Sequence, residues 1–407
     1  MTKPPDHLTT WQWHEAARNS EVTTLAGGTA RGKKSMKQET ELNIQELASA
    51  FAAEHVSSRI DLQTGQEFPM DLWRKMGQAG LFKIGIPEIY GGMDGGYIDL
   101  LKAGEAFVQS GYNLGLALSW LYQQIIAHYV LGVFGTRRQR EQYLSAAAAG
   151  RITLSFAVSE PGHGSRPRLL TTEARKQDHG YMLNGEKTYL TNGPIAGIFI
   201  VVAVTDDQTP QKRFTAFMVP RTAEGVTVTK PLAMNFLKPS PHGGIKLDHC
   251  LIEKKSVVGK EGSAWRDIVV PLGEIEDVVM MGPVLGGMAA QLSLLTAAVR
   301  EHLACPDAAF LGELGAQKAL LQTLRIIAYE SAHRLDRGSA SPVPLVITFT
   351  RLATEFHAGI ARIADRGNIT PHDEYAYLHR DLESLVSLKK RLMQIRQEKI
   401  GAALLKN

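Results

Sequence analysis

The pattern of apolar and polar residues divides this chain into three regions after its first residues. From about residue 39 to residue 150, apolar positions recur at the spacing of one helix face. In the run ETELNIQELASAFAAEHV, the apolar residues that share a face are Leu42, Ile44, Leu47, Phe51 and Val56. A second helix is predicted over FPMDLWRKMGQAGLF, with Pro69 in its first turn and glycines near its end. The first part of the chain is therefore expected to be helical.

The pattern changes at Arg151. Runs such as ITLSFAVSE, IFIVVAVT and RFTAFMVP are short and rich in β-branched and aromatic residues, and LNGEK, TNGP and DDQTP supply turns between them. This texture is typical of a small antiparallel barrel or sandwich. Helical spacing returns after about Ala264 in four long segments with short connections, which predict a bundle.

The succession of helices, strands and helices predicts an α+β fold with four parts. Residues 1–38 are expected to form a disordered or loosely ordered tail, because they are polar and lack sustained periodicity. Residues 39–150 are expected to form an N-terminal all-α domain and 151–262 a middle antiparallel β-barrel or sandwich domain. Residues 263–407 are expected to form a C-terminal four-helix bundle.

Composition narrows the class of protein. The formal net charge of the 407 residues is only +4, which does not favour nucleic-acid binding. Cys250 and Cys305 lie far apart without a CxxC pattern, so we expect no metal site and a reducing, cytoplasmic location. No run approaches the roughly 18 consecutive apolar residues of a membrane span. These features favour a soluble globular protein.

One stretch is unusually dense in turn-forming and hydrogen-bonding residues. AVSEPGHGSRPRLLTTEA, residues 157–174, places Pro, Gly, Ser, His and Arg between apolar runs. A glycine-rich turn lets backbone N–H groups approach an anion. The stretch is therefore either a ligand-binding loop or the corner of a sheet.

Several motifs in a fixed order carry a resemblance to a known family. They are FPMDLWRKMGQAGLFKIGIPEIYGGM, FGTRRQREQYLSAAAAG, FAVSEPGHGS and LNGEKTYLTNG. In these runs, and over nearly its whole length after the tail, the chain resembles the acyl-CoA dehydrogenase family. The resemblance implies FAD as cofactor, held between the β-domain and the bundle.

The resemblance also implies which residues contact the flavin. Ser159 and the backbone around Val158 would bind the pyrimidine edge, Thr191 would lie near N5 and Tyr189 would pack on the ring. The cofactor-binding candidates are Phe156, Val158, Ser159, Gly164, Ser165, Tyr189, Thr191 and Arg300. Without the resemblance, Ser159 would read as an ordinary strand hydroxyl and Tyr189 as a half-buried sheet aromatic.

The implied reaction is α,β-desaturation of an acyl thioester, which needs a carboxylate base. Most family members carry that base shortly after an Arg-Asp pair, and here the position falls on Lys389. A minority carry it on the first bundle helix, and IEDVVMMGPVLGGM aligns Glu276 with that position. Glu276 is therefore the candidate base. The alternative is an acid on an exposed helix end, beside Glu274 and Asp277. Glu383 matches no family base.

Other positions depart from the family pattern. Asp277 replaces a common Arg, although by position it remains a substrate-binding candidate together with Ser165. Arg166 stands where Asp is usual, and His163 where Ala is usual. Arg300 matches the family's pyrophosphate-binding arginine only weakly.

Three hypotheses follow from these motifs. The first is an FAD-dependent dehydrogenase of an acyl-CoA or a carrier-protein-bound acyl group, an oxidoreductase acting on CH–CH bonds. It would be a homodimer or homotetramer, with an electron-transfer flavoprotein or O2 as electron acceptor. The second keeps the fold and FAD but changes the chemistry, as in an oxygenase. The third is a non-catalytic relative that binds a partner or has a structural role.

Overall fold

A computed structural model describes residues 44–65, 67–208, 211–303, 305–369 and 372–405. The predicted tail, 1–38, lies outside them. The chain divides into two compact units. The helical unit takes its described residues from Met1–Gln63, Tyr97–Ala117 and Asp277–Asn407, and the sheet unit comprises Thr64–Gly96 and Leu118–Glu276. The predicted all-α domain, 39–150, thus contributes to both units.

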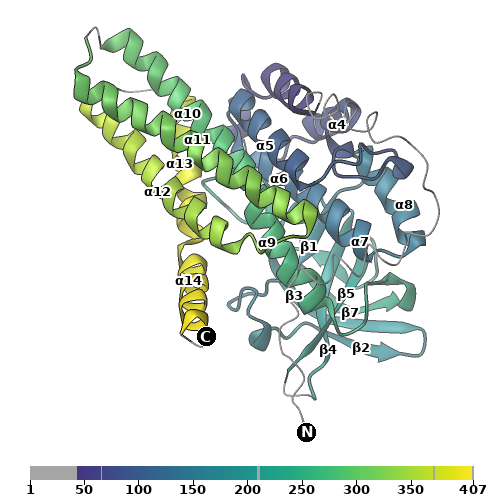
Figure 1. Ribbon diagram of the computed structural model, residues 1–407. Coiled ribbons are helices and arrows are strands. Elements are labelled where there is room, and N and C mark those ends of the chain that lie inside the picture. Colours follow the sequence, from purple (N-terminus) through teal and green to yellow (C-terminus); the bar gives the residue numbers. More distant parts are fainter. Residues whose placement is uncertain (1–43, 66, 209–210, 304, 370–371, 406–407) are drawn as a thin grey trace, which may run out of the picture. The chain divides into compact units, whose positions relative to one another are not determined.

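Long helices that run side by side build the helical unit (Figure 1). Residues 44–55 are helical, and the remaining helices are α5 (Tyr97–Gly111), α10 (Met281–His302), α11 (Ala308–Arg337), α12 (Val343–Arg366), α13 (Asp373–Leu388) and α14 (Lys390–Leu404). Two glycines bring α10 against α5: a Cβ on Gly282 would lie 2.0 Å from the carbonyl oxygen of Leu101, and one on Gly286 2.2 Å from that of Glu105. Only glycine permits this approach. The GPVLGG run of the sequence therefore has a packing role.

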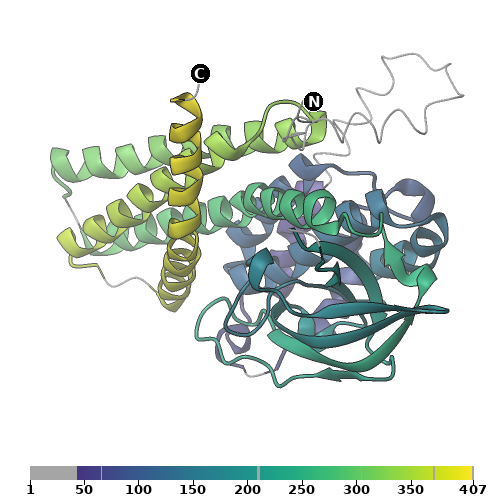
Figure 2. The same cartoon turned by 90° about the horizontal axis from the view of Figure 1, so that it is seen from below.

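Two of the four helical segments predicted for 263–407 are divided in the described structure. The first separates at Met280 into α9 (Val270–Val279) and α10. The last predicted segment is not continuous, because it divides at Lys389 into α13 and α14. The pattern could not reveal this break, since the run from Asp373 to Leu404 contains no Pro and Gly only at Gly401. Figure 2 shows α14, in yellow, crossing the direction of the bundle helices.

The sheet unit contains eight strands and several short helices. The strands are β1 (Leu154–Ala157), β2 (Glu173–Gln177), β3 (Gly180–Thr191), β4 (Ile198–Asp206), β5 (Arg213–Pro220), β6 (Val226–Val228), β7 (His242–Glu253) and β8 (Val257–Val258). Their order is β6-β7-β3-β2-β4-β5-β8, with β1 paired to β4 off this path. The pairs are antiparallel as predicted, except that β1 runs parallel to β4 and Glu173 of β2 meets Val204 of β4 in parallel register.

The sheet unit also contains helices, of which all but α9 precede its strands in the chain. They are α4 (Met70–Ala79), α6 (Leu114–Ile125), α7 (Gly132–Phe134), α8 (Arg137–Ala148) and α9 (Val270–Val279), of which α6 and α9 cross the boundary between the units. As predicted, α4 begins after Pro69 and ends at Gly80, whose left-handed φ of 88° suits a glycine. A buried cluster that includes Tyr181, Phe199 and Phe217 forms the core of the strands.

One helical run is apolar enough, by length and composition, to cross a membrane. It spans Trp265–His302, 38 residues, with a mean hydropathy of 1.7 in its most apolar window. That window is 83% buried inside the protein, as in the core helix of a soluble protein. The run is therefore weak support for a membrane span.

Candidate functional site

A buried ion pair fixes the end of β1, where the cofactor candidates begin. Lys187 of β3 is fully buried and Glu160 is 2% exposed. The Lys187 ammonium donates to Glu160 Oε1 at 3.0 Å and to the carbonyl oxygen of Val158 at 2.9 Å. The backbone N–H of Thr188 donates to the carbonyl of Ser159 at 2.8 Å. These hydrogen bonds tie the segment 158–160 to β3.

Glu160 also receives hydrogen bonds from the segment that follows the loop. Thr171 donates through its N–H (2.7 Å) and its hydroxyl (2.9 Å), and Thr172 through its N–H (2.8 Å). Burial acts to raise the pKa of Glu160, but Lys187 and these donors outweigh it and lower the pKa to about 2. Burial lowers the pKa of Lys187 to about 8 although Glu160 opposes the shift. The carboxylate is thus a structural anion that closes the loop between β1 and β2.

The loop itself is a tight turn with an arginine brace. Glu160 and Gly164 exchange backbone hydrogen bonds of 3.0 Å. The Arg166 guanidinium donates to the carbonyl oxygens of His163, at 2.9 Å, and Gly162, at 3.2 Å. Arg166, which departs from the family pattern, therefore stabilises the turn through backbone carbonyls. His163 is exposed at its tip.

The turn leaves open space and free hydroxyls. A Cβ built on Gly162 or Gly164 would meet nothing within 4 Å. Both glycines have positive φ, 72° and 59°. Among the described residues, none forms a hydrogen bond with the hydroxyl of Ser159 or of Ser165. The loop thus presents unused donors and accessible backbone to a ligand.

Tyr189 stands out from the sheet in a strained conformation. The pairing of β3 with β7 is irregular between Lys187 and Leu190, so Tyr189 leaves the regular ladder. Its φ is +57° and its side chain is 65% exposed. The interpretation of Tyr189 as a half-buried sheet aromatic is therefore wrong. Residues held in such strained backbone conformations cluster at functional sites.

Thr191 lies at the end of β3, with contacts on both sides. Its carbonyl oxygen accepts a hydrogen bond from the Ser155 hydroxyl at 2.8 Å. Its hydroxyl lies 3.2 Å from Nε2 of His242, its cross-strand partner on β7. Thr191 is buried, at 6% exposure. The remaining strand candidates, Phe156 and Val158, are half-buried and buried, respectively.

The acidic helix α9 contains the candidate base. Glu276 is half-buried, and Asp277, the next residue, is 7% exposed. The alternative, that these acids lie together on an exposed helix end, is therefore wrong for Asp277. Lys389 donates to Asp277 Oδ1 at 2.5 Å, and Arg396 Nη1 lies 2.6 Å from Oδ2 without hydrogen-bond geometry. Burial acts to raise the pKa of Asp277, but these two cations lower it.

Most, but not all, of the predicted site residues belong to the sheet unit. Seven of the eight cofactor candidates, together with Glu276, belong to the sheet unit. Arg300 is exposed in the last turn of α10, and it belongs with Asp277 to the helical unit. Sequence reasoning missed Glu160, Lys187 and His242 as site residues. Glu160 and Lys187 stand inside the quoted motifs, whereas no signal marked His242.

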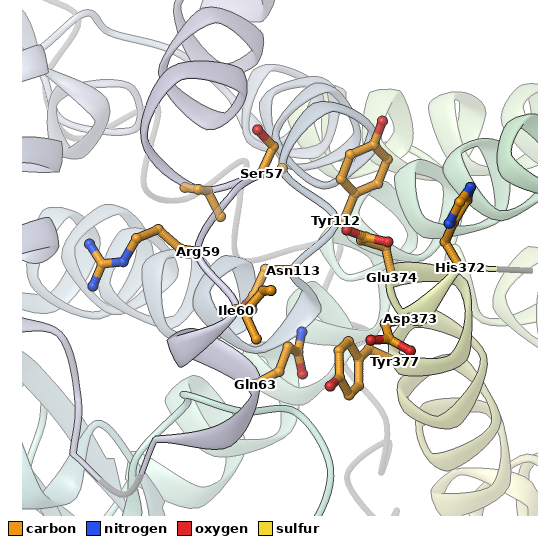
Figure 3. Close-up of a pocket in the computed structure, with 12 residues that line it drawn as sticks. Ser57, Arg59, Ile60, Gln63, Tyr112, Asn113, His372, Asp373, Glu374 and Tyr377 are labelled. Atoms are coloured by element: carbon orange, nitrogen blue, oxygen red, sulfur yellow. The ribbon is translucent and has the colours of Figure 1, made fainter.

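A cavity of about 340 Å³ lies in the helical unit (Figure 3). Arg59, Gln63 and Tyr377 are among its lining residues. Its polar side chains bind neighbours, since Arg59 pairs with Asp61 and Gln63 accepts from Arg380 at 3.0 Å. The cavity contains none of the predicted site residues.

Comparison with known proteins shows which family has this fold and the loop between β1 and β2. Residues 38–151 match the model of the acyl-CoA dehydrogenase N-terminal domain, and residues 155–250 that of the middle domain. The mitochondrial isovaleryl-CoA dehydrogenase of Arabidopsis thaliana is 28% identical over 321 residues, 77% of this chain and 78% of that protein.

Two solved structures share the fold. Butyryl-CoA dehydrogenase from Megasphaera elsdenii superposes with a TM-score of 0.81 at 20% identity, over 94% of this chain and 100% of that one. The structure of PigA with FAD and proline superposes with a TM-score of 0.76 at 21% identity. The match covers 90% of this chain and 97% of that one. The two matched domains cover more than half of the chain, which therefore belongs to the acyl-CoA dehydrogenase family.

Proposed function

We propose that this protein is an FAD-dependent dehydrogenase that introduces an α,β double bond into an acyl thioester. The observation that carries the proposal is a set of features within the sheet unit. They are two hydroxyls that no described residue engages, an exposed glycine turn, and an exposed aromatic two residues before buried Thr191. Family membership supplies the reaction class. The acyl group would be carried by coenzyme A or by a carrier protein.

The residues of this face fit a flavin. A flavin needs hydrogen-bond partners along its pyrimidine edge and flat apolar walls. Ser159 has a hydroxyl that no described residue engages, and Tyr189 has an exposed ring. Ser165 and Gly164 stand on a turn with room for an anionic group. We propose Phe156, Val158, Ser159, Gly164, Ser165, Tyr189 and Thr191 as the FAD contacts, and Arg300 as a pyrophosphate contact.

The reaction divides between cofactor and protein. FAD, when bound, would accept the hydride from the β-carbon of the acyl group. Glu276 would remove the α-proton onto its carboxylate, and the electron pair of the broken C–H bond becomes the new double bond. Hydrogen bonds to the thioester carbonyl are needed because they make the α-proton acidic. Ser165 and Asp277 are the proposed substrate contacts, although the Asp277 carboxylate already binds two cations.

The electron acceptor follows from the same reaction. Reduced flavin must be reoxidised, and we propose an electron-transfer flavoprotein or O2 as acceptor. We also propose a homodimer or homotetramer in the cytoplasm.

The second candidate function keeps the fold and FAD without dehydrogenation. Lys389 favours it, because a cation occupies the position where most of the family has its base. Its bond to Asp277 means that the position also lacks a free group to take a proton. Dehydrogenation therefore depends on Glu276.

The purified protein tests both candidates. Flavin absorbance of the isolated protein tests cofactor binding. Anaerobic loss of that absorbance with a panel of acyl-CoAs and carrier-bound acyl groups tests dehydrogenation. A yellow protein that no acyl thioester bleaches would support the second candidate, and a protein that binds no FAD would rule out both.

A further inference from the structure

His242 is held between two oxygen atoms of different character. Its Nδ1 lies 3.1 Å from the carbonyl oxygen of Ser240, and its Nε2 lies 3.2 Å from the Thr191 hydroxyl. A carbonyl oxygen only accepts, so Nδ1 must carry a proton. In the neutral ring Nε2 is then an acceptor. The Thr191 hydroxyl must therefore donate its proton to His242.

The ring and the hydroxyl are held in place by the sheet. Thr191 and His242 are cross-strand partners of β3 and β7. The backbone N–H of Asn192 donates to the carbonyl of Pro241 at 2.9 Å, and the Ser155 hydroxyl donates to the Thr191 carbonyl. Burial lowers the pKa of His242, although the Ser240 carbonyl opposes the shift. This favours the neutral ring at neutral pH.

We propose that His242 is a positioning residue that directs the proton of the Thr191 hydroxyl toward the imidazole, so that the hydroxyl offers only lone pairs to a flavin. The inference rests on the proposed function, in which Thr191 lies near flavin N5. Oxidised flavin carries an acceptor at N5, whereas the reduced form carries an N–H donor. A hydroxyl locked as an acceptor therefore stabilises the reduced cofactor and favours hydride uptake.

The flavin midpoint potential measures this preference. His242→Phe keeps a flat aromatic ring and removes both nitrogens, which frees the Thr191 proton to turn toward oxidised flavin. A single hydrogen bond changes an equilibrium by about fivefold to tenfold. The reduced-to-oxidised equilibrium of the bound flavin is therefore expected to fall by up to about tenfold, or ~30 mV for a two-electron couple.

Thr191→Val and the double variant Thr191→Val with His242→Phe complete a double-mutant cycle. Thr191→Val should lower the potential by itself, and adding His242→Phe should lower it no further. His242→Gln, which can accept from Thr191 through its side-chain oxygen, should recover part of the wild-type potential. An unchanged potential in His242→Phe, or additive effects in the double variant, would overturn the proposal.

A second measurement does not depend on FAD. In the ¹⁵N spectrum of the cofactor-free protein, the tautomer protonated on Nδ1 is expected for His242, and loss of the Thr191 hydroxyl should shift the Nε2 resonance. The tautomer protonated on Nε2 would overturn the proposal even if FAD binds. If the wild-type protein takes up no FAD while this spectrum shows the Nδ1 tautomer, the proposed function fails and the arrangement of His242 and Thr191 stands.

Discussion

Lys389 binds Asp277, its ammonium nitrogen 2.5 Å from the carboxylate oxygen Oδ1. Each residue departs from the family pattern at its own position. By the sequence resemblance, Lys389 would take the place of the usual carboxylate base, and Asp277 that of a common arginine. Their opposite charges hold the two positions together in this protein. We infer that the two departures form one compensated change within the helical unit.

Lys389→Met should destabilise the protein, because it leaves the buried Asp277 carboxylate with Arg396 as its remaining cation. Removing one partner of a buried pair costs several kcal/mol, but Lys389 is 27% exposed, so we expect about 1–3 kcal/mol. Urea unfolding measures this loss. The double variant Asp277→Asn with Lys389→Met should lose less unfolding free energy than the two single variants lose in sum. Lys390 is exposed, so Lys390→Met is the control. Equal unfolding free energies for Lys389→Met and Lys390→Met would contradict the inference.

Glu160→Gln should destabilise the sheet unit, because it leaves the Lys187 ammonium buried beside a neutral amide. The expected loss is roughly 3–5 kcal/mol at neutral pH, by urea unfolding. Glu186→Gln is the matched control, since Glu186 is 42% exposed and lies 3.9 Å from Lys246. A Glu160→Gln variant as stable as Glu186→Gln would show that the buried pair contributes nothing.

Because of the Glu160 carboxylate, we expect the unfolding free energy of the wild-type protein to fall at acid pH. The pKa of Glu160 falls from 4.5 to about 2 on folding, so the unfolded state binds more protons between these values. The stabilisation is complete above pH 4.5 and is lost as the pH falls toward 2. It amounts to about 3 kcal/mol. Unfolding free energies measured from pH 5 to 2 should show this slope in the wild type and a shallower one in Glu160→Gln.

Tyr189→Gly should change stability and flavin binding in opposite directions. Tyr189 has a φ of +57° and is 65% exposed, so glycine relieves strain while the lost side chain removes little packing. We expect a gain of about 1 kcal/mol in unfolding free energy and weaker FAD binding.

Tyr189→Ala separates the two effects, since it removes the ring and keeps a Cβ at positive φ. It should bind FAD as weakly as Tyr189→Gly without the gain in stability. Wild-type FAD affinity in both variants would exclude Tyr189 as a flavin contact.

The sequence predicted the order of elements well because that order rests on local periodicity and turn chemistry. Pro69 and Gly80 bound α4 as expected, and the strands follow the β-branched runs. Pairings between distant segments leave no such local signal. The parallel contact of β1 with β4 is one example, and the break at Lys389 is another.

The candidate site was predictable only where a motif marked it. Ser159, Ser165, Tyr189 and Thr191 stand within the family's runs. His242 became visible only through the register of β7 on β3, which sets it opposite Thr191. The partners of Asp277 lie more than one hundred positions away in the chain, so its burial could not be inferred from the acidic run around it.

Glu276→Gln tests the proposed base. The amide keeps the shape of the side chain and cannot take the α-proton, so we expect a rate of flavin bleaching about 10²- to 10⁴-fold lower, with FAD still bound. Glu274→Gln is the control, because Glu274 is also half-buried on α9 but two residues earlier, on a different face of the helix. Stopped-flow absorbance under anaerobic conditions measures both rates. A Glu276→Gln variant that bleaches as fast as Glu274→Gln would remove Glu276 as the base, and Lys389 offers no carboxylate to replace it.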